Sequence, residues 1–311
     1  MNIYSSFAPN NFITVQYDDY TNFNDLNKDT FFSYKFFIDN VLLEDYSKLV
    51  KDCEDKNITY TKSNRCKLLD WVDEGDLSWE YLSFNPNAID LLKINPEEIN
   101  WQHLSSNLNA IDLLRDNPEK IDWHFLSANS NAIDLLKENL EKIDWEELSL
   151  NPSAIDMLKE NLEKIDWEGL SLNPSAIDLL KENPEKIDWY WLSSNPNAID
   201  LLRDNLKKIH WGRLSTNPNA IDLLKENPEK IDWYWLSCNP NAIDLLRENV
   251  DKIDWCYLSF NPNAIELLSD NIDKINWRCL SANPGAIDLI KEYYDDYIYW
   301  DDLSTNPMIF E

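Results

Sequence analysis

The 311-residue sequence contains only four glycines, Gly75, Gly169, Gly212 and Gly285, and they are scattered along the chain. Enzymes of the P-loop and dinucleotide-binding classes cradle phosphates with clustered glycines. The scattered placement therefore excludes both classes of nucleotide site.

Histidine and cysteine are also scarce. The three histidines lie outside any HExxH or Cys/His arrangement, and the five cysteines lack CxxC spacing. Structural and catalytic metal sites draw on such clusters, and disulfide frameworks use an even number of regularly spaced cysteines. We therefore expect no metal site, no cofactor and no disulfide framework.

Long apolar runs and positive charge are lacking as well. No run approaches the roughly 18 apolar residues of a membrane span, and residues 1–15 lack the basic start of a signal peptide. Lys and Arg number 28 against 57 Asp and Glu, a net charge of −29 that repels phosphate backbones and anionic lipids. We expect a soluble, unsecreted protein that binds neither nucleic acid nor membrane. The acidic surface either attracts a basic protein or simply keeps the chain soluble.

Tryptophan, by contrast, recurs at a constant interval of 22 residues. The series comprises Trp79, Trp101, Trp123, Trp145, Trp167, Trp189, Trp211, Trp233, Trp255 and Trp277, and Trp300 follows after a one-residue insertion. With Trp as position 1, the unit reads W-x-x-L-S-x-N-P-x-A-I-D-L-L-K-E-N-P-E-K-I-D, as in residues 167–188. Self-similarity at such a period is typical of tandem-repeat architectures.

Each unit contains the start and stop signals of two short helices. Asp at position 22 suits the N-cap of a helix of about six residues that begins at Trp, and Asn-Pro at positions 7 and 8 suits the start of a second. The second Asn, at position 17, ends this helix after about ten residues. One unit buries too little apolar surface to fold alone, so neighbouring units must stack. The sequence predicts an all-α fold, an α-solenoid of about ten two-helix repeats.

Four segments follow from the repeat boundaries. Residues 1–65 carry no repeat and form either a small N-terminal cap or an interaction arm. Residues 66–78 are a degenerate first half-repeat, residues 79–298 are ten tandem repeats, and residues 299–311 are a partial C-terminal repeat. We expect the modified ends to cover the apolar faces that a solenoid otherwise exposes.

Positions 2 and 3, directly after each Trp, vary most among the copies. Aromatic residues and Arg, which dominate the binding energy of protein interfaces, are frequent there. One interpretation is a partner-binding face, and the other is a packing contact that tolerates variety. On the first interpretation the partner-binding residues are Tyr190, Trp191, Tyr234, Trp235, Tyr257, Phe125, Tyr81 and Arg213.

Carboxylates are abundant at positions 12, 16, 19 and 22, but they recur in nearly every copy. A catalytic acid/base pair is a local exception with perturbed pKa values. The repeated carboxylates are better explained as helix caps and surface pairs, so we expect no enzymatic activity.

The unit W-x-x-L-S-x-N-P-x-A-I-x-L-L-x-x-N, as in residues 189–205, resembles the short Trp and Asn-Pro tandem repeats of giant nucleocytoplasmic DNA viruses, the mimivirus-like group. The resemblance implies a viral origin and a scaffold or host-interaction role, and it assigns no reaction or functional residue. We expect a non-enzymatic scaffold that binds a host or viral protein, located in the host-cell cytoplasm or the virion. The alternative is a structural virion or assembly component, a spacer or cement protein.

Overall fold

The computed structural model describes residues 67–293 and 298–310, which divide into two compact units. Unit 1 contains residues 67–100 and the described residues from 277 onward, and unit 2 contains residues 101–276. The described residues form α-helices and 3-10 helices and contain no β-strand, which confirms the predicted all-α class. The predicted N-terminal cap or arm, residues 1–65, lies outside the described residues.

Unit 2 alternates two kinds of α-helix with 3-10 turns. The helices that begin at Trp, here called the Trp row, are α4 (Trp101–Ser106), α6 (Trp123–Ser127), α8 (Trp145–Leu150), α10 (Trp167–Leu172), α12 (Trp189–Leu192), α14 (Trp211–Thr216), α16 (Trp233–Leu236) and α18 (Trp255–Phe260). The helices that begin at Ile, the Ile row, are α5 (Ile111–Arg115), α7 (Ile133–Lys137), α9 (Ile155–Lys159), α11 (Ile177–Glu182), α13 (Ile199–Arg203), α15 (Ile221–Glu226), α17 (Ile243–Arg247) and α19 (Ile265–Ser269). The 3-10 turns are η3 (Pro118–Lys120), η4 (Leu140–Lys142), η5 (Leu162–Lys164), η6 (Pro174–Ala176), η7 (Pro196–Ala198), η8 (Leu206–Lys208), η9 (Pro218–Ala220), η10 (Pro228–Lys230), η11 (Pro240–Ala242), η12 (Val250–Lys252) and η13 (Ile272–Lys274).

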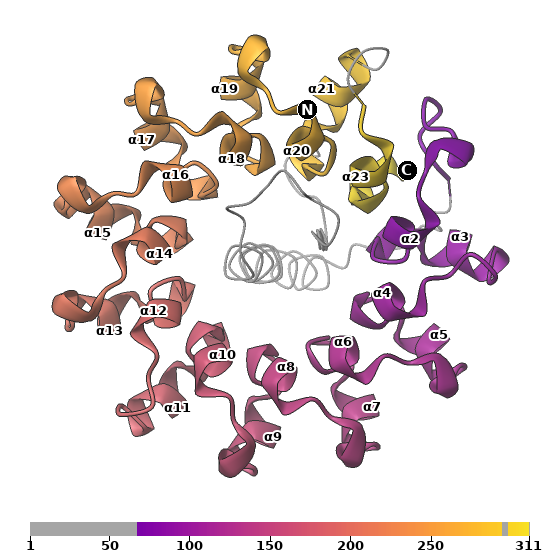
Figure 1. The fold of residues 1–311 in the computed structure, drawn as a ribbon, viewed down its shortest axis with the longest axis horizontal. Helices are drawn as coiled ribbons and strands as arrows, with labels where there is room; N and C mark the ends of the chain where they lie inside the picture. The colour runs from indigo at the N-terminus through magenta and orange to yellow at the C-terminus, as the bar shows by residue number, and fades with distance from the viewer. Residues whose placement is uncertain (1–66, 294–297, 311) are drawn as a thin grey trace, which may run out of the picture. The chain divides into compact units, whose positions relative to one another are not determined.

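The two rows form two layers of unit 2. Its Trp row lies on the concave side and its Ile row on the convex side (Figure 1). Consecutive members of the Trp row contact each other, as α8 does with α6 and α10. This stacking of successive two-helix repeats confirms the predicted solenoid.

Side-chain caps mark the start of both helices of a repeat. The second helix is shorter than expected. Asp122 caps α6, since its carboxylate accepts the main-chain N–H groups of His124 and Phe125 at 3.1 and 3.3 Å. In the repeat that begins with α10, Asn173 accepts the N–H of Ser175 at 3.0 Å, as expected of an N-cap. The Pro-Ser-Ala that follows forms the 3-10 turn η6, so the α-helix begins only at Ile177. The predicted ten-residue helix is therefore a 3-10 turn followed by a six-residue α-helix.

The core of each repeat lies between the two rows. Leu170, Ala176 and Leu180, at positions 4, 10 and 14, are fully buried, and so are their equivalents in the other repeats of unit 2. Full burial of a Leu side chain contributes roughly 1.5–3 kcal/mol, and Ala at position 10 lets the turn approach its neighbours closely. The recurrence of these residues explains why the repeats stack.

Within unit 2, buried asparagines at position 7 connect each repeat after the first to the one before it. The Nδ2 of Asn151 donates to the main-chain oxygens of Ser127 and Asn129, both at 3.0 Å, while its Oδ1 accepts the N–H of Ser153. The same pair of inter-repeat bonds recurs throughout this asparagine ladder, which comprises Asn129, Asn151, Asn173, Asn195, Asn217, Asn239 and Asn261. Sequence reasoning found the cap but missed the bonds between repeats.

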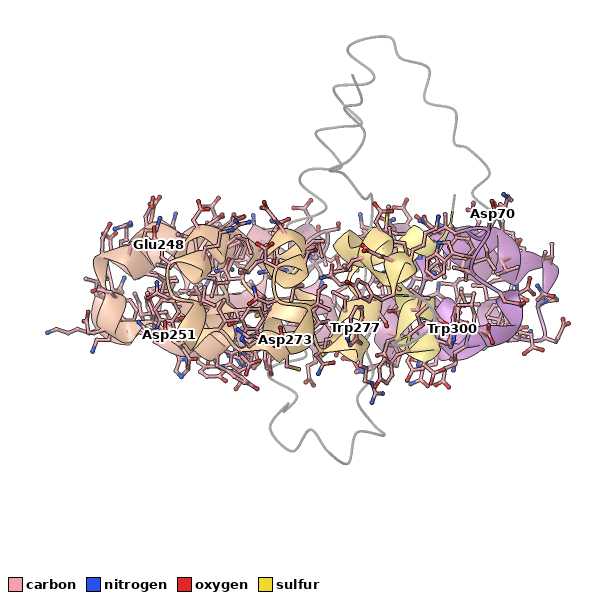
Figure 2. All side chains as sticks on the ribbon, turned by 90° about the horizontal axis from the view of Figure 1, so that it is seen from above. Asp70, Glu248, Asp251, Asp273, Trp277 and Trp300 are labelled. Carbon is pink, nitrogen blue, oxygen red and sulfur yellow. The ribbon has the colours of Figure 1, made fainter. Side chains whose placement is uncertain are left out.

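Unit 1 contains the repeat of α2 (Trp79–Leu82), η2 (Pro86–Ala88) and α3 (Ile89–Ile94) and the repeat of α20 (Trp277–Ser281), η14 (Pro284–Ala286) and α21 (Ile287–Glu292). It also contains η1 (Glu74–Asp76), α23 (Trp300–Thr305) and η15 (Pro307–Ile309). The helices α20 and α23 are neighbours, and Figure 2 shows Trp277 and Trp300 at the same height on them. The partial C-terminal repeat thus stacks on the last full repeat.

The same partial repeat also stacks on the first full repeat. Nδ2 of Asn85 donates to the main-chain oxygens of Ser304 and Asn306 at 3.0 and 3.1 Å, which reproduces the asparagine ladder. The N–H of Ser78 donates to the hydroxyl of Ser304 at 2.8 Å, as the residue at position 22 does in the full repeats. We call this contact between residues 300–310 and residues 68–88 the seam.

At the seam, the two partial repeats form one composite repeat. The C-terminal segment supplies the helix of the Trp row, α23, and the N-terminal segment supplies the closing 3-10 turn η1. No second α-helix is present in residues 67–78, where an antiparallel bridge joins Leu68 to Phe310. The described parts of the predicted first half-repeat, 66–78, and of the predicted partial C-terminal repeat, 299–311, therefore meet.

Candidate partner-binding surface

The predicted binding residues follow the first residue of helices in the Trp row. Tyr190 and Trp191 lie on α12 and Tyr234 and Trp235 on α16, and all four are partly exposed. Phe125 on α6 is also partly exposed. These five side chains lie within unit 2 and form its candidate surface. The sixth partly exposed candidate, Tyr81, is on α2 of unit 1.

Two of the predicted binding residues are buried. Arg213 is 1% exposed and Tyr257 is 6% exposed, and both contact side chains of neighbouring repeats. Position 3 points toward the adjacent helix of the Trp row at these two sites. Their assignment to an exposed binding surface is therefore corrected, because they offer almost no area to a partner.

Position 2 of one repeat contacts position 3 of the next. The Tyr190 hydroxyl accepts from Arg213 Nη2 at 2.8 Å, and the Tyr234 hydroxyl donates to that of Tyr257 at 2.7 Å. In unit 1, Nε of Arg278 donates to Oδ2 of Asp302 at 3.2 Å. Packing thus explains part of the variation at these positions. In each pair, the two side chains can form a hydrogen bond or an ion pair and lie 23 or 24 residues apart in the sequence. This spacing could have indicated the contact from the sequence, but it was not used.

The Arg213 guanidinium lies between aromatic rings from the repeats on both sides. Its central carbon is 4.4 Å from the ring centre of Tyr190, 4.5 Å from that of Trp191 and 5.8 Å from that of Trp235. A cation over aromatic faces gains roughly 0.5–2 kcal/mol, more when water is excluded. Arg213 therefore links the aromatic pair on α12 to Trp235 on α16.

Edge-to-face contacts fix the orientation of both aromatic pairs. The rings of Tyr190 and Trp191 are 5.1 Å apart, and those of Tyr234 and Trp235 are 5.2 Å apart. Tyr257 supports the second pair at 4.2 Å from Tyr234 and 5.6 Å from Trp235. Because these rings hold one another, the exposed parts of Tyr190, Trp191, Tyr234 and Trp235 form a rigid surface, here called the aromatic surface.

A histidine replaces the usual Asp cap next to this surface. Nδ1 of His210 accepts the N–H of Arg213 at 3.1 Å, which requires that nitrogen to be unprotonated. Burial and the nearby charge of Arg213 lower the pKa of His210, so the neutral form is favoured. Burial and the hydrogen bond with Tyr234 raise the pKa of Tyr257, which keeps its phenol neutral. The one positive charge among these groups at neutral pH is that of Arg213.

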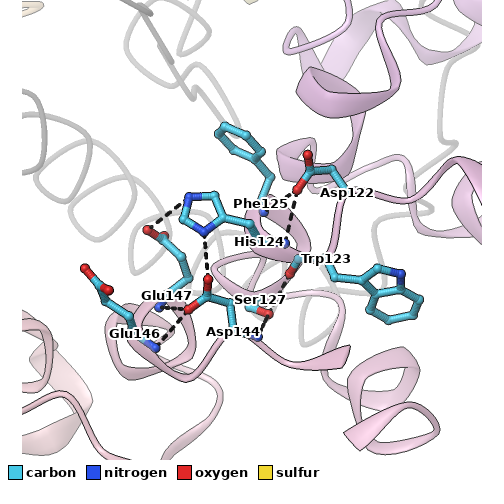
Figure 3. A network of polar contacts seen from close by, with 8 residues as sticks. All are labelled: Asp122, Trp123, His124, Phe125, Ser127, Asp144, Glu146 and Glu147. Carbon is cyan, nitrogen blue, oxygen red and sulfur yellow. Dashed lines mark hydrogen bonds and ion pairs between the residues drawn. The ribbon is translucent and has the colours of Figure 1, made fainter. Parts of the chain in front are cut away.

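A second polar contact between repeats surrounds His124 (Figure 3). Its Nδ1 lies 2.9 Å from Oδ2 of Asp144, the cap of α8, and its Nε2 lies 3.6 Å from Oε1 of Glu147. Burial lowers the pKa of His124, but the bond to Asp144 and the nearby carboxylates outweigh it and raise the pKa above its usual value. In Figure 3 the indole of Trp123 extends away from this contact. His124 therefore joins α6 to α8 rather than forming a separate site.

The rim of the Trp row carries lysines that lie over the tryptophans. Nζ of Lys164 is 4.3 Å from the ring centre of Trp145. The same contact recurs in the pairs Lys120–Trp101, Lys142–Trp123, Lys208–Trp189, Lys252–Trp233 and Lys274–Trp255. Exposed carboxylates such as Glu248, Asp251 and Asp273 cover other parts of the surface of unit 2 (Figure 2). The lysine at position 20 thus lies over the Trp of its own unit in these repeats, and the three labelled carboxylates face solvent.

Within residues 67–293 and 298–310, no group of three or more His, Cys, Asp and Glu side chains could hold a metal ion. Cys238 is buried, which raises the pKa of its thiol to about 12 and leaves it protonated at neutral pH. In the same residues, no helix has the length and apolar character needed to cross a membrane.

Comparisons with protein-family models, with curated proteins and with solved structures found no match for this chain. The resemblance to giant-virus repeats therefore stays a prediction. The aromatic surface has to be interpreted from its own geometry.

Proposed function

We propose that this chain is a non-enzymatic repeat scaffold that binds a protein partner through its aromatic surface. The observation that carries the proposal is the aromatic surface itself: four partly exposed Tyr and Trp side chains, two on α12 and two on α16, held around Arg213. Tyr and Trp bury large areas with few rotatable bonds, so they dominate many interfaces. Rings already fixed by their neighbours lose little further entropy when a partner binds.

The chemistry of this surface favours a protein over other ligands. Half-buried rings with hydroxyl and indole edges offer apolar area together with hydrogen-bond donors, which suits the mixed surface of a folded protein or peptide. The net charge of −29 opposes nucleic acids and anionic lipids. Titratable groups near the surface have explained structural roles, such as His210 as a helix cap.

The test compares partner capture by the intact chain and by variants. A quadruple Ala variant at Tyr190, Trp191, Tyr234 and Trp235 should lose its partners, and captured proteins should then be tested as purified components. The matched control replaces four exposed apolar residues elsewhere in unit 2, Leu140, Leu162, Leu206 and Val250, by Ala. This control variant should retain the partners that the intact chain captures.

Circular dichroism checks that each variant remains folded. If the quadruple variant unfolds, the double variant Trp191→Ala and Trp235→Ala keeps both tyrosines and serves as the probe. Capture of the same partners with unchanged affinity by a folded aromatic variant contradicts the proposal.

A further inference from the structure

The seam in unit 1 joins two surfaces that no short covalent connection holds together. Asn85 and Ser304 are 219 residues apart in sequence, yet their contact uses the bond that links successive repeats. Nδ2 of Asn85 lies 3.0 and 3.1 Å from its two acceptors, against 3.0 Å for both acceptors of Asn151 in unit 2. The two faces of the seam are therefore as complementary as two neighbouring repeats.

Two further hydrogen bonds across the seam end on main-chain oxygens of the C-terminal segment. The N–H of Leu69 donates to the oxygen of Ile309 at 2.8 Å, and Nδ2 of Asn87 donates to the oxygen of Pro307 at 2.9 Å. Leu303 and Ile309 on the C-terminal side are fully buried. Separation of the faces would expose this apolar area and leave several polar groups to be solvated. An open seam therefore favours binding of another surface with the shape of the face that has left.

The seam is nevertheless the less firmly held part of the described structure. Its composite repeat has no second α-helix in residues 67–78. Ser78 before α2 and Tyr299 before α23 provide no side-chain cap, whereas Asp144 caps α8 with two bonds. A side-chain N-cap stabilises the first turn of the helix that it precedes. Opening at the seam therefore costs less than opening between two full repeats of unit 2.

We propose that the seam is an exchangeable interface and that the partner it fits is a second copy of this chain. In the exchanged dimer, residues 300–310 of each copy lie against residues 68–88 of the other. Reciprocal exchange leaves no face exposed, because each copy carries both complementary faces. This inference is independent of the aromatic surface and of the partner proposed for it.

Concentration decides between the two arrangements. Within one chain the two faces meet at a high effective concentration, so the closed monomer prevails in dilute solution. At high protein concentration, or when mild denaturant opens the seam, capture by a second copy competes with closure. The exchanged dimer then persists after dilution, because its release again requires opening of both seams.

The first experiment mixes two isotopically distinct preparations of the full-length chain at high concentration in mild denaturant. The mixture is then returned to buffer and examined by native mass spectrometry. We expect dimers of mixed isotope composition. Asn85→Ala should form them about tenfold faster than the intact chain, because it removes two buried hydrogen bonds from the seam. Asn151→Ala, which removes the equivalent bonds inside unit 2, is the matched control and should leave the rate near that of the intact chain.

The second experiment locks the seam. Leu68→Cys with Phe310→Cys places a cysteine on each partner of the antiparallel bridge. Oxidation of the dilute monomer should close the seam and abolish mixed dimers, and a reducing agent should restore them, with the native cysteines present in both states. Mixed dimers that still form in the oxidised variant would show that another surface carries them and would overturn the proposal. Absence of mixed dimers from both the intact chain and Asn85→Ala overturns it equally.

Discussion

The Trp row of unit 2 and the seam of unit 1 use the same hydrogen bonds but differ in the layer behind them. In unit 2 each helix of the Trp row is followed by a helix of the Ile row, whose buried Leu residues complete the core. At the seam, in the part of the chain that the structure describes, η15 and an antiparallel bridge follow α23. The asparagine and serine bonds are therefore common to both contacts, and we expect the second helix to make the contacts of unit 2 harder to open.

The largest expected effect comes from removal of a buried Leu at position 4. Leu148→Ala in unit 2 and Leu303→Ala at the seam each delete a fully buried side chain, at a cost of roughly 2–5 kcal/mol. Hydrogen exchange followed by mass spectrometry should show faster exchange around α8 for the first variant and around α23 and α2 for the second. If hydrogen exchange in α2 is the same in Leu303→Ala as in the intact chain, the C-terminal segment does not stabilise the first repeat.

A smaller effect is expected at the position 5 serines, whose hydroxyls bridge two elements. Ser127 donates to the oxygen of Trp123 and accepts the N–H of Asp144, and Ser304 does the same for Trp300 and Ser78. Ser127→Ala should cost about 1–3 kcal/mol because it leaves the partly buried N–H of Asp144 without its acceptor, while the oxygen of Trp123 keeps its helical bond. Ser304→Ala should cost less, since the less firmly held seam lets water reach the N–H of Ser78.

Thermal unfolding of both serine variants measures this difference. Ser269→Ala is the control, because its exposed hydroxyl bonds only within its own helix, and it should change stability by less than about 0.5 kcal/mol. If Ser304→Ala lowers the free energy of unfolding more than Ser127→Ala does, the seam is not the less firmly held of the two regions.

The smallest effect concerns His124, which links α6 to α8 in unit 2 through its bond with Asp144. Its pKa is raised above the ordinary 6.5, so its contribution is complete below pH 6.5 and is lost as the pH rises through the raised value. Burial raises the pKa of Asp144, but the bond from His124 outweighs it and the pKa falls below 3.8, so the contribution of Asp144 is lost as the pH falls through that lowered value. The pair therefore stabilises most between the two pKa values.

Urea unfolding of the intact chain and of His124→Gln at several pH values tests this sign. The free energy of unfolding of the two proteins should differ by at most about 1 kcal/mol near pH 6, because the His124–Asp144 pair is half exposed. This difference should vanish well above neutral pH. Tyr234→Phe, which alters a contact at the same repeat position without a titrating group in this range, should show no such pH dependence. A difference that grows toward high pH contradicts the assigned charge state of His124.

Much of the fold follows from local patterns in the sequence. Asp122 and Asn173 cap the helices where the pattern places them, because a cap depends on residues only two or three positions away. The length of the second helix was wrong, since the Asn-Pro start favours a 3-10 turn before the α-helix begins at Ile177. The turns at positions 18–20, such as η5, were not expected at all.

The candidate surface was only partly predictable. Tyr190 and Trp191 are partly exposed as the binding interpretation requires, but the same interpretation placed buried Arg213 on the surface. A sequence shows that position 3 varies without showing whether a given side chain points to solvent or to the next helix. Arg213 is buried because rings from two other repeats surround it, and those contacts span up to 23 residues.

The period, the two helices of each unit and the stacking of the repeats follow from the sequence alone, because they depend on capping and apolar spacing within 22 residues. The bonds of Asn85 to Ser304 and Asn306, and the composite repeat formed by the two incomplete ends, become visible only in the folded chain. A half-repeat looks the same in sequence whether its open face meets a cap, solvent or the other end of the chain. The choice among these depends on contacts between residues more than 200 positions apart, and a 22-residue pattern does not predict such contacts.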